Sequence, residues 1–260
     1  MRVFKTEDMI CHPTPKINIG LNVICKREDG FHDIETLFYP VSAWQDELEI
    51  TRADAFSISI EGADWDPMSD LTAKAWRLLR DECGIGPVAI HMIKGIPVGA
   101  GLGGGSSDCA FALKMMDRLF ELNLGTRRLE QLAGRLGSDC AFFIRNTPQW
   151  GSGRGEILTP AVLDLSGYDI RLAIPDHSHV STAEAYRGIH AHLPQTPLRD
   201  ALQLPVNQWE GLVINDFEKS VFPAHPEIRA LKARMYEDGA LYASMTGSGA
   251  AVFGIFDKER

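Results

Sequence analysis

The sequence is poor in cysteine, has no long apolar run and has no excess of positive charge. Its five cysteines are Cys11, Cys25, Cys83, Cys109 and Cys140. This odd number, with no C-x-x-C pair, disfavours both a disulfide framework and a cysteine-ligated zinc site. No stretch reaches the roughly 18 apolar residues of a membrane span, and the N-terminus has no apolar run of signal-peptide length. We therefore expect a cytoplasmic protein without a membrane span.

The charge balance is acidic. The chain has 26 lysines and arginines against 35 aspartates and glutamates, a formal net charge of -9. Nucleic-acid binding requires a basic face, so we expect no nucleic-acid partner. A small anionic ligand stays compatible with this charge, because a few placed cations and backbone N–H groups reverse the local field.

The length of 260 residues suits one large domain or two small ones. Segments with strand periodicity and segments with helix periodicity are mixed without a regular βαβ order, which indicates an α+β fold in two lobes. Glycines interrupt the pattern from about residue 150, so we place the domains at 1–152 and 153–260. The pattern predicts a helix that begins near Ser69 and a helix capped by Ser106 or Ser107.

A glycine-rich loop at residues 97–107 is the strongest feature of the chain. Five of its seven residues from Gly99 to Gly105 are glycine, so a ligand can approach the backbone without meeting a Cβ atom. The loop enters a helix, whose free N–H groups and positive dipole end favour phosphate. Ser106 and Ser107 add hydroxyl donors or oxygens that face a metal. The segment therefore indicates a phosphate-binding loop.

Two well-known nucleotide motifs fit this loop poorly. Gly99, Gly101 and Gly104 match the G-x-G-x-x-G dinucleotide fingerprint, but the second strand that this motif needs about 20 residues later is replaced by two predicted helices. A P-loop needs a lysine after its last glycine, and none follows Gly104. A different phosphate loop, ending in paired serines, is favoured over a simple tight turn, which needs one glycine rather than five.

Three further segments carry polar residues at the ends of predicted strands and helices. They are Lys16-Ile17-Asn18-Ile19, Leu136-Gly137-Ser138-Asp139 and Met245-Thr246-Gly247-Ser248-Gly249. Taken singly, each has an ordinary interpretation. The lysine is typical of a solvated strand end, the aspartate of a helix cap, and the glycine turn of a β-hairpin.

Together, and in this order, the four segments resemble the GHMP kinases, named for galactokinase, homoserine kinase, mevalonate kinase and phosphomevalonate kinase. Segments 29–38, 153–156 and 215–218 extend the resemblance to nearly the whole chain. It implies an α+β, two-lobed fold with an N-terminal lobe like ribosomal protein S5 and a ferredoxin-like C-terminal lobe. It also implies ATP as the phosphoryl donor, accompanied by Mg²⁺ whose ligands the sequence does not identify.

Within this family, the segment Gly30-Phe31-His32 matches members that phosphorylate the alcohol of a small cytidyl diphosphate substrate on the non-mevalonate route to isoprenoids. By this resemblance Lys16 and Asp139 are catalytic: the carboxylate takes the proton of the alcohol, and the ammonium keeps the carboxylate ionised. Phe31 and Tyr186 are expected to stack on the base while His32 hydrogen-bonds its edge. Asn18 is expected to hold the substrate's phosphates or its alcohol.

The resemblance implies two sets of binding residues. Those expected to bind ATP are Lys94, Pro97, Val98, Gly99, Ala100, Gly101, Leu102, Gly103, Gly104, Gly105, Ser106 and Ser107. Those expected to bind the substrate are Asn18, Phe31, His32, Asp139, Thr182, Tyr186, Gly247 and Ser248.

Three alternatives stay open on sequence grounds. One is a GHMP kinase of the homoserine or mevalonate type, which has no cytosine to stack on Phe31. The second is a catalytically silent nucleotide-binding protein, which is disfavoured because both expected catalytic residues, Lys16 and Asp139, are present. The third is an NAD-dependent oxidoreductase, disfavoured by the missing strand. The sequence does not distinguish a monomer from a homodimer.

Overall fold

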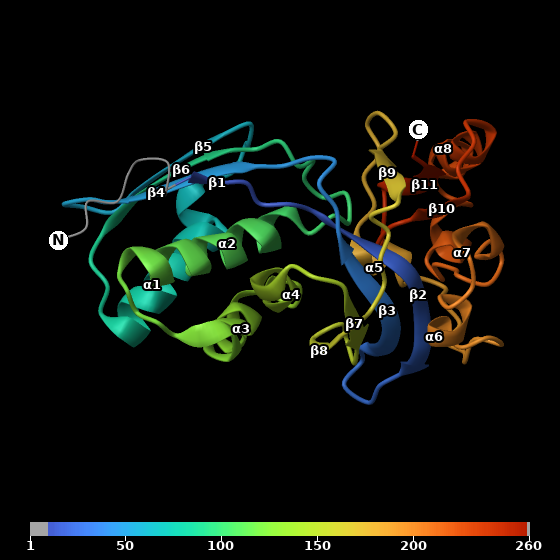
Figure 1. Ribbon diagram of the computed structural model, residues 1–260, viewed down its shortest axis with the longest axis horizontal. Coiled ribbons are helices and arrows are strands. Elements are labelled where there is room, and N and C mark those ends of the chain that lie inside the picture. The colour runs from blue at the N-terminus through green and yellow to red at the C-terminus, as the bar shows by residue number, and fades with distance from the viewer. Residues whose placement is uncertain (1–9, 259–260) are drawn as a thin grey trace. The chain divides into compact units, whose positions relative to one another are not determined.

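A computed structural model describes residues 10–258 and contains two compact units (Figure 1). Of the described residues, the first unit comprises 10–15, 44–98 and 103–147, and the second comprises 16–43, 99–102 and 148–258. Each unit is therefore assembled from separate stretches of sequence. The family-domain division at 152/153 is a different partition and stays a prediction.

The first unit contains a four-stranded sheet with helices on one face (Figure 1). The strand order is β1-β4-β6-β5; β5 runs parallel to β6, whereas the other pairs are antiparallel. The bounds are β1 Ile10–Cys11, β4 Glu47–Arg52, β5 Ser57–Glu61, β6 Val88–Ile93, α1 Leu71–Cys83, α2 Gly104–Leu119, α3 Gly125–Leu136, α4 Cys140–Arg145 and the 3-10 helix η2 Pro67–Ser69.

The ends of α1 and α2 show how local chemistry sets the helices. The predicted helix near residue 69 is confirmed as α1: Asp70 caps it by accepting the N–H of Thr72, and Gly84 ends it with a φ of 69°. The predicted serine cap of α2 is wrong. Gly103 occupies the N-cap with a φ of 72°, so the glycine backbone completes the turn and Ser106 and Ser107 fall inside the first helical turn.

The second unit contains two antiparallel sheets, of order β2-β3-β7-β8 and β10-β11-β9, and α8 packs on β10 and β11. The bounds are β2 Lys16–Lys26, β3 His32–Pro40, β7 Gln149–Ser152, β8 Ile157–Pro160, β9 Tyr168–Ala173, β10 Tyr242–Met245, β11 Val252–Asp257, α5 Thr182–Ala185, α6 Leu198–Ala201, η3 Val206–Gln208, α7 Glu218–Val221 and α8 Pro226–Glu237.

The described part of the chain has no helix that is both long and apolar enough to cross a bilayer. All five cysteines are free; Cys109 and Cys140 are buried, whereas Cys25 is exposed.

The segment 214–218 ties β2 to β10. The N–H of Leu21 donates to the carbonyl of Ile214 at 2.8 Å, and the N–H of Asp216 donates back to the carbonyl of Leu21 at 2.8 Å. The carboxylate of Asp216 also accepts the N–H of Val23 at 2.8 Å. On the other side, the Glu218 carboxylate accepts the N–H of Met245 at 2.9 Å. The motif at 215–218 therefore joins two sheets.

Asn215 closes this connection. It is 2% exposed, and its Nδ2 donates to the carbonyls of Met245 at 2.8 Å and Gly247 at 2.9 Å. Its Oδ1 accepts the N–H of Phe217 at 3.0 Å. One buried amide thus fixes the backbone that follows β10.

Asn215→Ala is expected to lower the free energy of unfolding by about 2–4 kcal/mol, because it removes the side-chain hydrogen bonds to the buried carbonyls of Met245 and Gly247. The measurement is urea unfolding followed by circular dichroism. Asn207→Ala is the matched control, since Asn207 is exposed and its change is expected to stay within about 0.5 kcal/mol. Equal stabilities of the two variants would contradict the assigned role of Asn215.

Candidate active site

Lys16 begins β2 with its side chain inside the second unit. The residue is 4% exposed, and its Nζ donates to Asn18 Oδ1 at 2.6 Å and to the carbonyl of Gly101 at 2.8 Å. The ammonium also lies 5.5 Å from the centre of the Phe38 ring. A lysine at a strand end is ordinarily solvated, so its burial against the glycine loop sets it apart.

Asn18 orients this lysine. Its Nδ2 donates to Thr36 Oγ1 at 3.0 Å, which leaves Oδ1 directed at Lys16. The Thr36 hydroxyl in turn donates to the carbonyl of Gly20 at 2.5 Å. The N–H of Asn18 donates to Thr246 Oγ1 at 2.9 Å and so links β2 to the turn after β10. Both ends of the Asn18 amide therefore have protein partners.

The glycine loop and the late glycine turn pack against each other within the second unit. Gly101 has a φ of 80°, and a Cβ atom there would lie 2.6 Å from the carbonyl oxygen of Thr246. A Cβ atom on Gly247 would lie 3.1 Å from the carbonyl oxygen of Gly101. Backbone bonds from Lys16 to Leu102 at 2.9 Å and from Ala251 to Ala100 at 3.2 Å hold the loop in place. The structure thus brings three of the four sequence motifs together.

The rest of the loop, residues 97–98 and 103–107, belongs to the first unit. Ser106 lies in the first turn of α2. Ser107 is fully buried, and among the described residues neither its Oγ nor Asp108 Oδ1 has a hydrogen-bond partner. Buried polar atoms are almost always satisfied, so these two oxygens indicate a missing water or ligand. No group of three or more His, Cys, Asp or Glu within residues 10–258 could hold a metal by itself.

Lys94 lies at the entrance of the loop in a buried ion cluster. Its side chain is 3% exposed and is paired with Asp46 and, at 2.6 Å, with Asp108. The other oxygen of Asp46 accepts the N–H groups of Gly95 at 2.6 Å and Ile96 at 2.7 Å. Burial acts to lower the pKa of Lys94, but the two carboxylates outweigh it and raise this pKa above its usual value. Burial also raises the pKa of Asp108 well above its usual value.

This cluster connects the backbone before the loop to helix α2, which follows it. The predicted contact between Lys94 and the nucleotide stays a prediction, because the ammonium here bonds to two carboxylates. The sequence does not predict a role for Asp46. It stands outside every motif, and only the packing of the first unit shows that it holds Lys94.

Asp139 lies between α3 and α4, at the N-cap position of α4. It is half-buried, and the hydroxyl of Ser138 donates to its Oδ1 at 3.4 Å. Asp139 belongs to the first unit and Lys16 to the second. The approach of the ammonium to the carboxylate therefore stays a prediction.

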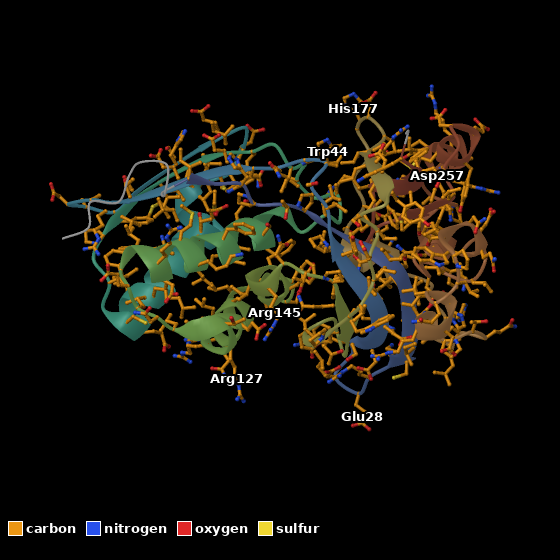
Figure 2. All side chains as sticks on the ribbon, in the orientation of Figure 1. Glu28, Trp44, Arg127, Arg145, His177 and Asp257 are labelled. Carbon is orange, nitrogen blue, oxygen red and sulfur yellow. The ribbon has the colours of Figure 1, made fainter. Side chains whose placement is uncertain are left out.

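The residues expected to bind the cytosine base all lie in the second unit. Phe31 and His32 follow the β2–β3 turn, where Glu28 lies (Figure 2), and Tyr186 follows α5. The rings of His32 and Tyr186 stack at a centroid distance of 4.8 Å, and Phe217 packs edge-on against Tyr186 at 4.7 Å. Phe31 is 54% exposed. The ring is therefore accessible to a ligand.

Arg154 is a second residue that sequence reasoning missed. Its guanidinium lies 4.9 Å from the centre of the Phe31 ring, and its backbone N–H donates to Glu156 at 2.6 Å. The motif at 153–156 thus gives a cation beside an exposed aromatic ring. Thr182 is also exposed at the start of α5, where Ser181 caps the helix.

Comparison with known proteins agrees with the motifs. The family model described as "GHMP kinases N terminal domain" matches residues 70–146, and that described as "GHMP kinases C terminal" matches residues 199–260. A 4-diphosphocytidyl-2-C-methyl-D-erythritol kinase from Bacteroides thetaiotaomicron is 49% identical, over 96% of this chain and 93% of the relative. A kinase of the same name from Parabacteroides distasonis is 46% identical, over 96% and 92%.

A solved structure supports the same assignment. The crystal structure of a 4-(cytidine 5'-diphospho)-2C-methyl-D-erythritol kinase superposes with a TM-score of 0.83 at 32% identity, over 95% of this chain and 90% of the other. The predicted resemblance and the predicted α+β GHMP-kinase fold are therefore confirmed. The chain belongs to the GHMP kinases, within the family of 4-diphosphocytidyl-2-C-methyl-D-erythritol kinases.

Proposed function

We propose that this protein transfers the γ-phosphoryl group of ATP to the 2-hydroxyl of 4-diphosphocytidyl-2-C-methyl-D-erythritol, on the non-mevalonate route to isopentenyl diphosphate. The observation that carries the proposal is the convergence of Lys16, Asn18, the glycine loop and the 246–249 turn in one unit. Relatives that align over 92–93% of their own length bear the name of this kinase.

The glycine loop supplies the phosphate site in this proposal. Gly99, Gly101 and Gly103 all have φ values near 70–80°, a backbone form that residues with side chains rarely adopt. The loop leads into α2, a 16-residue helix whose N-terminal N–H groups attract phosphate. Catalysis of phosphoryl transfer consists mostly of positioning and charge neutralisation, which such a loop provides.

The acceptor hydroxyl needs a base. In the proposed reaction its oxygen attacks the γ-phosphorus and forms a new O–P bond. The bond between this phosphorus and the bridging oxygen breaks and leaves ADP, while the hydroxyl proton passes to the carboxylate of Asp139. Lys16, held by Asn18 and the Gly101 carbonyl, supplies a fixed positive charge that stabilises negative charge on the reacting oxygens.

Magnesium is proposed to accompany the nucleotide. Mg²⁺ prefers oxygen ligands and is usually held by few protein groups together with substrate phosphates. The unpartnered oxygens of Ser107 and Asp108 at the start of α2 have this chemistry, and we propose them as its protein ligands. Bound there, the ion would neutralise phosphate charge.

The cytosine is proposed to stack on Phe31 and Tyr186, with His32 at its edge. The stacked rings of His32 and Tyr186 leave no space for a third ring between them. Binding by this arrangement therefore requires His32 to turn away from Tyr186. Thr182, Gly247 and Ser248 are proposed to contact the rest of the substrate.

Three further expectations also stay proposals. The family domains are placed at 1–152 and 153–260, the protein is placed in the cytoplasm, and no nucleic-acid partner is expected.

Purified protein with ATP and Mg²⁺ is expected to release ADP when 4-diphosphocytidyl-2-C-methyl-D-erythritol is added, and not when homoserine or mevalonate is added. A coupled ADP assay measures this. Turnover with homoserine or mevalonate would retain the kinase but reject the base site at Phe31, His32 and Tyr186. No turnover with any of them, despite ATP binding, would favour a silent nucleotide-binding protein.

Asp139→Asn is expected to fold normally and to lower kcat by about 10²–10⁴-fold, because the amide cannot take the hydroxyl proton. Asp238→Asn, at an exposed position after α8, serves as the matched control and is expected to leave kcat unchanged. Near-normal kcat in Asp139→Asn would reject its role as the base.

Lys94→Met is expected to lower the free energy of unfolding by about 3–5 kcal/mol, because Asp46 and Asp108 would be left buried without their cation. Lys74→Met, at an exposed site of α1, is the control and is expected to change it by less than about 0.5 kcal/mol. Chemical unfolding measures both. A Lys94→Met protein as stable as the control would show that the ion cluster does not support the fold.

A further inference from the structure

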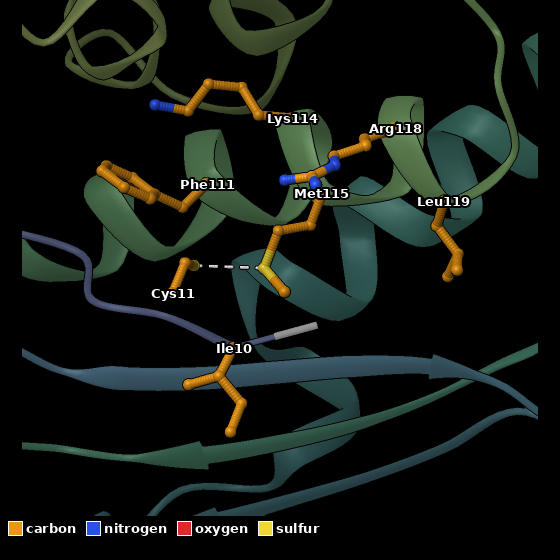
Figure 3. Close-up of a pocket in the computed structure, with 7 residues that line it drawn as sticks. All are labelled: Ile10, Cys11, Phe111, Lys114, Met115, Arg118 and Leu119. Atoms are coloured by element: carbon orange, nitrogen blue, oxygen red, sulfur yellow. Dashed lines mark hydrogen bonds between the residues drawn. The ribbon is translucent and has the colours of Figure 1, made fainter. Parts of the chain in front are cut away.

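A cavity lies in the first unit between β1 and the C-terminal half of α2 (Figure 3). Its volume is about 180 Å³. The residues that line it are Ile10, Cys11, Phe111, Lys114, Met115, Arg118 and Leu119. Neither the glycine loop nor any residue assigned above to ATP or substrate is among them.

Most of the wall is apolar. Phe111, Met115 and Leu119 come from α2, and Ile10 closes the opposite side from β1 (Figure 3). The thiol of Cys11 meets the sulfur of Met115 at 3.1 Å. Burial raises the pKa of Cys11 to about 12, so this side chain is neutral and part of the apolar lining. An apolar cavity of about 150 Å³ is known to accept a benzene-sized molecule, so this one suits a body of about six carbons.

Two cations, Lys114 and Arg118, line this wall. Phe111, Lys114, Met115 and Arg118 follow the spacing i, i+3, i+4 and i+7, which places them on one face of α2. Lys114 lies with its Nζ 3.6 Å from the centre of the Phe111 ring and donates to the carbonyl of Phe143 at 3.0 Å. No carboxylate within the described residues pairs with Lys114.

Among the described residues, the Lys114 ammonium thus has a carbonyl and an aromatic ring as partners, and no carboxylate. Burial lowers its pKa to about 8, as it does for a cation without a paired anion. Every other buried cation described above has polar partners for its charge: Lys94 has two carboxylates, and Lys16 has two oxygens. A bound anion would supply the negatively charged partner that the Lys114 ammonium lacks among the described residues.

The cavity is separate from the phosphate loop. At a rise of 1.5 Å per residue, residues 114–118 lie about 15–20 Å along α2 from its first residue, Gly104. A ligand in this cavity therefore does not occupy the loop at residues 97–107.

We propose that this cavity binds a small amphipathic anion, with an apolar body of about six carbons against Phe111, Met115 and Leu119 and a carboxylate or phosphate head on Lys114. Apolar burial and a single charge-assisted hydrogen bond act together, so neither half of such a ligand suffices alone.

The test is isothermal titration calorimetry of the full chain with four probes: hexanoate, hexyl phosphate, hexan-1-ol and inorganic phosphate. We expect the first two to bind at least tenfold more tightly than the last two. Tighter binding of hexanoate or of hexyl phosphate then identifies the head group as a carboxylate or a phosphate. Binding of inorganic phosphate as tight as that of hexyl phosphate, or of hexanol as tight as that of hexanoate, would overturn the proposal.

Variants locate the site. Lys114→Met is expected to weaken the better probe by about ten- to a hundredfold, the usual effect of losing a hydrogen bond to a charged group, whereas Lys114→Arg keeps the charge and most of the binding. Lys74→Met on α1 is the control and should bind normally. Unchanged affinity in Lys114→Met, or equal losses in Lys114→Met and Lys74→Met, would reject this cavity as the binding site.

Discussion

The candidate site depends on the absence of a side chain at Gly101. This residue lies between the ammonium of Lys16, which bonds to its carbonyl, and the turn at residues 246–249. A methyl group there would meet the Thr246 carbonyl at 2.6 Å and would also be strained by the φ of 80°. The close approach of strand β2, the loop and the late turn therefore requires glycine. Lys16 takes its position from this contact.

Buried polar groups then hold the glycine loop and the segments around it in place. In the second unit, Asn18 and Asn215 satisfy backbone and side-chain groups around the turn after β10. In the first unit, Asp46, Lys94 and Asp108 tie the residues before the loop to helix α2. Buried ion clusters add less to stability than apolar packing would, but they restrict geometry strongly when one partner cannot leave without exposing the others. The loop is thus anchored near both its ends.

The two cation sites of the first unit differ in a way that bears on their roles. Lys94 has carboxylates on its ammonium and a raised pKa, as expected for a structural ion pair. Lys114 has a carbonyl and an aromatic ring, and its pKa lies at about 8. Two lysines of the same unit therefore differ: within the described part of the chain, the ammonium of Lys94 has two carboxylate partners, and that of Lys114 has none.

The sequence by itself determined the family, the α+β class and the four motifs, because glycine spacing and strand periodicity are local properties of the chain. It also predicted a helix beginning near Ser69, which the structure confirms as α1 with Asp70 as its N-cap. It misjudged the start of α2, where Gly103 rather than a serine completes the turn. Only the tertiary structure decided which partners Lys94 and Lys16 have, that Asn215 joins β2 to β10, and that Lys114 faces a cavity. These contacts join residues far apart in the chain, and long-range packing leaves no periodic mark in the sequence.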